Sequence, residues 1–148
     1  MSLFHLNVTQ IKRSKGQSAI AAAAYRAGEK LYSEYYGEIS DYTKKHGVIC
    51  SEILLPNHAP REYADRQTLW NAVEKAERGK NAQLAYSFDI ALQNEFSLDE
   101  NIDLARQCQN CMQAGRSYRA RLFLRHSRGF AGRHILWVRD SAAGSRNR

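Results

Sequence analysis

The chain has 148 residues, of which 43% are hydrophobic, a size and composition that suit one folded domain with a buried core. It carries a net charge of +7, has no apolar run long enough to cross a membrane, and spaces its three cysteines unlike a disulfide framework. These properties exclude a disordered chain, a membrane span and a disulfide-stapled secreted domain, so we expect a cytoplasmic protein with reduced thiols.

The positive charge is concentrated in the last part of the chain. After Ala105 there are ten arginines, no lysine and a single acid, Asp140. A basic segment usually indicates a nucleic acid or another anionic partner. The abrupt change in composition predicts a boundary, with a first domain at 1–107 and a divergent arginine-rich tail at 108–148. That tail is either genuine or the result of a frameshift or truncation.

The first predicted element is a strand at LFHLNVTQI, because Phe4, Leu6 and Val8 alternate with polar residues. A basic turn, KRSKGQS, follows it. The stretch QSAIAAAAYRAGEKL then predicts a helix from Ser18 to Ser33, because alanine is the strongest helix former and serine is a good N-cap.

The stretch EYYGEISDYTKKHG predicts a hairpin or an ordered loop. Its tyrosines, beside two lysines, either pack under the hairpin, the more usual case, or stack on bases next to phosphate contacts. Further strands are predicted at VICSEILLP, QLAYSFDIAL, RARLFLRH and HILWVRD, and a helix at 62–80 whose Glu74 and Glu77 lie on a solvated face. Ser97 and Glu100 form a capping box that opens another helix. The order of elements predicts an α+β fold with a mainly antiparallel sheet.

Tyr25 interrupts the alanine-rich helix. The apolar stripe of this predicted helix passes through Ile20, Ala24, Ala27 and Leu31, which places Tyr25 to the side of the stripe. Two interpretations stay open from these residues. Tyr25 is an anchor at the edge of the core, or its hydroxyl is presented to a bulky reactant. A phenol acting as a nucleophile would need a base or a metal to assist it.

Several stretches, in order and at matching spacing, resemble the N-terminal nicking domain of MobA/MobL-type plasmid relaxases, the MobQ or TraA-like group. They are FHLNV, RSKGQSAIAAAAYRAGEKLYSE, DYTKKHGV, SEILLPNHAP and DRQTLWNAVEKAERGKNAQLAYSFDIALQNEF. The resemblance covers about residues 3–107. It implies a five-stranded antiparallel sheet flanked by helices, of the His-hydrophobe-His nuclease type.

The resemblance also implies a reaction for Tyr25. The tyrosine at this position of the motif attacks a phosphate of single-stranded DNA at an origin of transfer. It keeps the 5′ phosphate and frees a 3′ hydroxyl. The basic residues nearby, Lys12, Arg13, Lys15 and Arg26, are the expected DNA-binding residues. Single-stranded origin DNA and accessory mobilisation proteins are the expected partners, and the expected cofactor is a divalent metal, Mg²⁺ or Mn²⁺.

The family's metal ligands are a histidine that ends a strand and a following Pro-His-x-His strand, and this sequence has no Pro-His-x-His. His126 and His134 lie at strand-like positions in the tail, and His5 lies on the first strand, but incidental surface histidines are the more usual explanation. Cys108 and Cys111 have a zinc-like spacing, yet with these histidines they fall outside the usual finger pattern. The metal ligands of this chain are therefore left unassigned.

Two functions stay open. The chain is a relaxase that cleaves single-stranded DNA through a 5′-phosphotyrosyl intermediate, or it is a catalytically inactive relaxase fragment that only binds nucleic acid. A replication initiator or transposase of the same nuclease class is a third candidate, and the stretches RSKGQSA and LWNAVE favour mobilisation over it.

Overall fold

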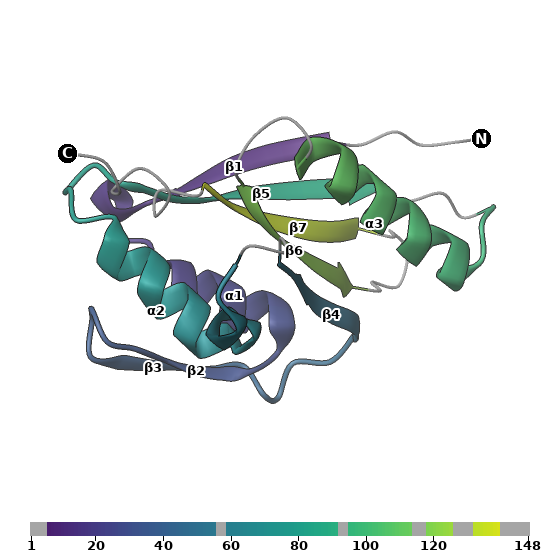
Figure 1. Cartoon of the computed structure of the whole chain (residues 1–148). Helices are drawn as coiled ribbons and strands as arrows, with labels where there is room; N and C mark the ends of the chain where they lie inside the picture. Colours follow the sequence, from purple (N-terminus) through teal and green to yellow (C-terminus); the bar gives the residue numbers. More distant parts are fainter. Residues whose placement is uncertain (1–5, 56–58, 92–94, 114–117, 126–131, 140–148) are drawn as a thin grey trace.

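The computed structural model describes residues 6–55, 59–91, 95–113, 118–125 and 132–139 (Figure 1). Its main sheet has the strand order β1-β5-β7-β6-β4, and every neighbouring pair is antiparallel. These strands are β1 (Leu6–Lys12), β4 (Val48–Leu54), β5 (Gln83–Ala91), β6 (Tyr118–Arg125) and β7 (Gly132–Arg139). A separate antiparallel hairpin joins β2 (Lys30–Ser33) to β3 (Glu38–Asp41). The predicted α+β fold with a five-stranded antiparallel sheet is confirmed.

Helices lie on both sides of the main sheet. They are α1 (Ala19–Ala27), α2 (Arg66–Ala76) and α3 (Leu98–Gln113), with short 3₁₀ turns at Arg13–Lys15 and Arg61–Ala64. Figure 1 shows α1 and α2 on one side of the sheet and α3 on the other. The alternation along β4 agrees, because Ser51 accepts a hydrogen bond from Arg66 of α2, whereas Glu52 contacts Arg106 of α3. Within the described ranges, no helix is long and apolar enough to span a membrane.

Helix α1 is shorter than predicted. The Ser18 hydroxyl caps its N-terminus by accepting a hydrogen bond from the backbone N–H of Ala21 at 3.2 Å. At the other end Gly28 adopts a left-handed conformation with φ of 67°, and its N–H donates to the carbonyl of Ala24 at 2.9 Å. The prediction of one helix from Ser18 to Ser33 was wrong, because Gly28 ends the helix and the next residues pair in the β2–β3 hairpin.

In strand β1, Val8 is not buried, although alternation predicted it on the apolar face. Val8 is exposed, whereas Ile11 is buried and pairs with the buried Ala85 of β5. β1 is an edge strand, and the core lies at its Lys12 end, so the apolar position nearer the start of the strand remains in solvent. Phe4 lies outside the described residues, and only the backbone of Leu6 is described.

The predicted helix at 62–80 is divided in two. A 3₁₀ turn at Arg61–Ala64 comes first, and α2 begins after Asp65, whose carboxylate accepts hydrogen bonds from the backbone N–H and hydroxyl of Thr68. Asp65 is therefore the N-cap of α2, because its carboxylate accepts hydrogen bonds from donors of the first helical turn. Leu69 and Trp70 of α2 are fully buried against α1.

The capping box that opens α3 is confirmed. The backbone N–H of Ser97 donates to the Glu100 carboxylate at 2.7 Å, and the N–H of Glu100 donates to the Ser97 hydroxyl at 3.3 Å.

The two strands predicted in the tail are also present, as β6 and β7. They lie between β5 and β4, so the segment after residue 107 supplies two inner strands of the sheet. The domain boundary itself and the frameshift origin of the tail stay predictions.

Candidate active site

Tyr25 lies in the last turn of α1, with its side chain directed away from the core. Ala23, Ala24 and Ala27 of the same helix are buried, whereas Tyr25 is 43% exposed. The prediction that Tyr25 lies beside the apolar stripe is confirmed. Alanines fit this helix because their small side chains let α1 pack closely on its neighbours, while the phenol remains accessible at the surface.

The segment that follows β3 holds the Tyr25 ring. Tyr42 contacts it edge-on, with ring centroids 5.3 Å apart and planes at 86°. The ammonium group of Lys45 lies 3.5 Å from the centroid of the Tyr25 ring and donates a hydrogen bond to the Tyr25 carbonyl oxygen. The backbone N–H of Tyr42 donates to the carbonyl of Glu29 at 3.2 Å, which fixes this segment to the end of α1. The ring is therefore held from two directions, while the residue as a whole is 43% exposed.

The N-terminus of α1 is fixed by Glu74 of α2. One carboxylate oxygen of Glu74 accepts hydrogen bonds from the Ser18 hydroxyl at 2.7 Å and the backbone N–H of Ile20 at 3.3 Å. The other oxygen accepts from the Ser33 hydroxyl at 2.9 Å. Glu74 is 1% exposed, so its prediction as part of a solvated face was wrong. A glutamate in a charged helix gives no local sign that its partners lie more than 40 residues away.

Two of the four expected DNA-binding residues are used inside the protein. Arg13 is buried and donates to the backbone carbonyls of Glu74, at 2.7 Å, and of Glu77. Arg26 donates to the hydroxyl of Ser87, which is fully buried on β5. These contacts join the first part of the chain to α2 and to the sheet. Binding of DNA by Arg13 and Arg26 stays a prediction that these contacts do not support.

The two lysines of the same prediction lie at the surface near the start of α1. Lys12 ends β1 and is half-buried, with its backbone N–H donating to the side chain of Gln17 at 3.0 Å. Lys15 is exposed in the 3₁₀ turn. Their role as DNA contacts stays a prediction compatible with this exposure.

The described residues do not fit a metal centre. In the described ranges, no three His, Cys, Asp or Glu side chains are grouped so that they could hold an ion. His5 and His126 lie outside the described residues. His134 lies in β7 and Cys108 and Cys111 in α3, where only the backbone is described. No reaction step below is therefore assigned to a metal.

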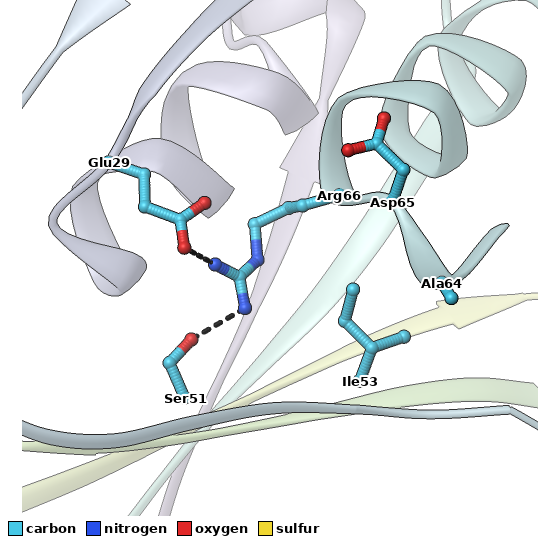
Figure 2. Close-up of a pocket in the computed structure, with 6 residues that line it drawn as sticks. All are labelled: Glu29, Ser51, Ile53, Ala64, Asp65 and Arg66. Carbon is cyan, nitrogen blue, oxygen red and sulfur yellow. Dashed lines mark hydrogen bonds and ion pairs between the residues drawn. The ribbon is translucent and has the colours of Figure 1, made fainter.

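A polar pocket of about 400 Å³ lies where the end of α1, β4 and the start of α2 meet (Figure 2). Figure 2 shows the guanidinium of Arg66 reaching between Glu29, with which it forms an ion pair, and Ser51, whose hydroxyl accepts at 2.6 Å. The residues that line the pocket are Glu29, Ser51, Ile53, Ala64, Asp65 and Arg66. Arg66 binds both Glu29 and Ser51, and Asp65 caps α2, so these groups join the elements that surround the pocket. We place the candidate active site at Tyr25 rather than in this pocket.

The chain is similar to proteins of plasmid transfer. It is 40% identical over 105 residues to the mobilization protein MobL of Acidithiobacillus ferridurans, covering 71% of this chain and 27% of that protein. It is 39% identical over 97 residues to the probable mobilization protein MobA of Bifidobacterium longum, covering 66% and 17%. Its identity to the conjugal transfer protein TraA of Rhizobium radiobacter is 36% over 116 residues, covering 72% and 10%. The chain thus spans about a quarter or less of the length of these relatives.

A solved structure described as "Molecular Basis of Vancomycin Resistance Transfer in Staphylococcus aureus" has a similar fold. It superposes with a TM-score of 0.84 at 30% identity, covering 93% of this chain and 70% of the other. The family model described as the MobA/MobL family matches residues 17–123, which extends past the boundary predicted at residue 107. The match includes Tyr25, most of the residues around it and the start of the tail. The chain belongs to the MobA/MobL family.

Proposed function

We propose that this chain is a relaxase domain of plasmid mobilisation, which cleaves single-stranded DNA at an origin of transfer with Tyr25 as the nucleophile. The observation that carries the proposal is the placement of Tyr25. It is an exposed phenol on a helix that is buried through its alanines and fixed at both ends, in a chain of the MobA/MobL family. A rigid helix supports transfer to phosphorus because the attacking oxygen must be held in line with the leaving oxygen.

The proposed reaction exchanges one phosphate ester for another. The phenolic oxygen of Tyr25 forms a bond to phosphorus, and the bond from phosphorus to the 3′ oxygen of the preceding nucleotide breaks. The phenol loses its proton to solvent, and the 3′ oxygen takes up a proton. The products are a 5′ phosphotyrosine and a 3′ hydroxyl. Because the ester bond is conserved, the reverse reaction can rejoin the strand.

The test is a covalent capture assay with the full chain. Single-stranded oligonucleotides labelled at the 3′ end, tiled along the DNA that flanks the gene, are incubated with Mg²⁺, with Mn²⁺ or with EDTA. The 3′-side fragment stays on the protein, so a labelled band of retarded mobility on a denaturing gel reports the adduct. We expect Tyr25→Phe to abolish this band. Tyr32→Phe, at a tyrosine of nearly equal exposure on β2, should leave it unchanged.

The outcomes distinguish the two functions. An adduct that persists in Tyr25→Phe would exclude Tyr25 as the nucleophile. Binding without an adduct under any metal condition would favour the inactive fragment, whose arginine-rich tail supports nucleic-acid binding. Such binding should weaken with salt, with a log–log slope of about −0.7 per neutralised phosphate. The EDTA arm tests whether an adduct requires the divalent metal that the family resemblance leads us to expect.

A further inference from the structure

Tyr42 and Lys45 combine two properties at the surface beside Tyr25. Tyr42 is 36% exposed although its ring contacts Tyr25. Lys45 places a positive charge over the Tyr25 ring. The two residues are joined by a backbone hydrogen bond of 3.0 Å from the N–H of Lys45 to the carbonyl of Tyr42, which sets their spacing. An exposed aromatic ring next to a fixed ammonium matches a base next to a backbone phosphate.

We propose that Tyr42 and Lys45 form a nucleotide-binding element for single-stranded DNA, in which Lys45 binds a backbone phosphate and Tyr42 stacks on the adjacent base. The inference rests on the proposed function, because it names how the DNA is held beside Tyr25. The Lys45 ammonium has three donors. One of them donates to the carbonyl of Tyr25. Because lysine binds phosphate as a point charge, the hydrogen bond to the Tyr25 carbonyl does not prevent this contact.

The charges around this element favour an anionic ligand. The neighbouring carboxylate of Asp41 accepts hydrogen bonds from the N–H and hydroxyl of Thr43, at 3.0 and 2.7 Å. Asp41 also lies 4.0 Å from the ammonium of Lys30, so its negative charge is engaged on its own hairpin. Arg13 and Arg26, in contrast, direct their guanidinium groups to backbone and buried acceptors within the protein. Lys45, by contrast, places its ammonium group against the Tyr25 ring.

Lys45 also has a structural contact, because the carbonyl of Tyr25 belongs to the last turn of α1 and lysine is favourable there. The test must therefore separate the helix contact from DNA binding. Lys45→Gln removes the charge and retains a hydrogen-bond donor for the carbonyl. Lys44→Gln is the matched control, because it removes the same charge from the exposed preceding residue. Tyr42→Leu removes the ring, and Tyr42→Phe keeps it.

The experiment measures the affinity of the full chain for a fluorescein-labelled oligo(dT) by anisotropy at several salt concentrations. We expect Lys45→Gln to weaken binding about eightfold at 50 mM salt and to reduce the salt slope by about 0.7, the counterion-release effect of one phosphate. Lys44→Gln should change the affinity less than about twofold. Tyr42→Leu should weaken binding roughly five- to 160-fold without changing the salt slope, and Tyr42→Phe should bind as the wild type.

The inference is overturned if Lys45→Gln and Lys44→Gln bind alike, if Tyr42→Leu binds as tightly as Tyr42→Phe, or if the wild type does not bind the probe. A lower thermal midpoint of Lys45→Gln with an unchanged salt slope would assign Lys45 to the helix end alone. The assay needs no cleavage. If the wild type forms no adduct but Lys45→Gln shows the expected reduction in salt slope, the inference stands and the proposed reaction is rejected. If the wild type forms the Tyr25 adduct but its salt slope equals that of Lys45→Gln, the inference alone is rejected.

Discussion

The carboxylate of Glu74 accepts a hydrogen bond from the hydroxyl of Ser18 at 2.7 Å, and so joins α2 to the first turn of the helix that carries Tyr25. The same carboxylate accepts from the N–H of Ile20 and the hydroxyl of Ser33. Three donors from α1 and β2 thus converge on one buried side chain. The orientation of α1, and with it the position of the Tyr25 hydroxyl, depends on a residue of another helix.

Replacing Glu74 by alanine should destabilise the fold. The change leaves the donors of Ser18, Ile20 and Ser33 without this acceptor, and an unsatisfied buried donor costs about 1–3 kcal/mol. Because the serine hydroxyls can rotate to other acceptors, we expect a total loss of about 2–4 kcal/mol in the free energy of unfolding, measured in urea. Lys75→Ala, at an exposed position of the same helix, should stay within about 0.5 kcal/mol of the wild type. Equal effects of the two variants would contradict this role of Glu74.

Gly28→Ala should destabilise the end of α1. Gly28 has φ of 67°, and an L side chain in this left-handed region costs about 1–2 kcal/mol. The added Cβ would meet a methyl group of Val48 at 3.5 Å, an ordinary contact, so backbone conformation rather than crowding sets the cost. Gly79→Ala is the control, since Gly79 has no such φ and the nearest atom would lie 3.9 Å away. If both variants shift the thermal midpoint equally, the left-handed conformation of Gly28 is not the cause of the destabilisation.

The ion pair between Glu52 of β4 and Arg106 of α3 should make stability depend on pH. The hydrogen bond from Arg106 holds the pKa of Glu52 below its ordinary value of 4.5. A lowered pKa in the folded state means that the stabilisation is complete above the ordinary pKa and is lost as pH falls through the lowered one. The thermal midpoint of Glu52→Gln should therefore lie below that of the wild type at neutral pH, and the two should converge in acid.

A matched control for this pair is Asp103→Asn. Asp103 lies 3.4 Å from Arg106 and is more exposed than Glu52, so its loss should have a smaller effect on the thermal midpoint. Added salt should also reduce the effect of Glu52→Gln because the pair is partly exposed. A difference between wild type and Glu52→Gln that stays constant from neutral to acidic pH would show that the ion pair is not responsible.

Cys50 should react slowly with alkylating reagents. Burial raises the pKa of its thiol, and the Glu52 carboxylate, 3.5 Å from the sulfur, raises it further. The thiolate is the reactive form, so a raised pKa lowers the rate at neutral pH. In a chain with Cys108→Ser and Cys111→Ser, iodoacetamide should label Cys50 several-fold more slowly in the folded state than in urea, as followed by mass spectrometry. Rates that do not differ would contradict a raised pKa.

Features that depend on residues close together in the sequence were predictable. The Ser97–Glu100 capping box and the position of Tyr25 beside the apolar stripe are confirmed, because both follow from the geometry of a single helix turn. The strand β5 and the two tail strands were predicted for the same reason, since alternation is a local property. The antiparallel α+β class followed from the order of these elements.

The tertiary structure decided which of these local possibilities is used. The alanine-rich stretch predicts a helix that continues to Ser33. In the structure, the last four residues of that predicted helix, Lys30–Ser33, pair with β3 and form a strand. Glu74 and Arg13 look like solvated charges in sequence, yet contacts with residues more than 40 positions away bury both. Tyr25 could be singled out from its own helix, whereas the placement of Tyr42 and Lys45 over its ring required the fold. Local sequence fixes the periodicity of an element, but burial and charge pairing depend on which distant segments the chain brings against it.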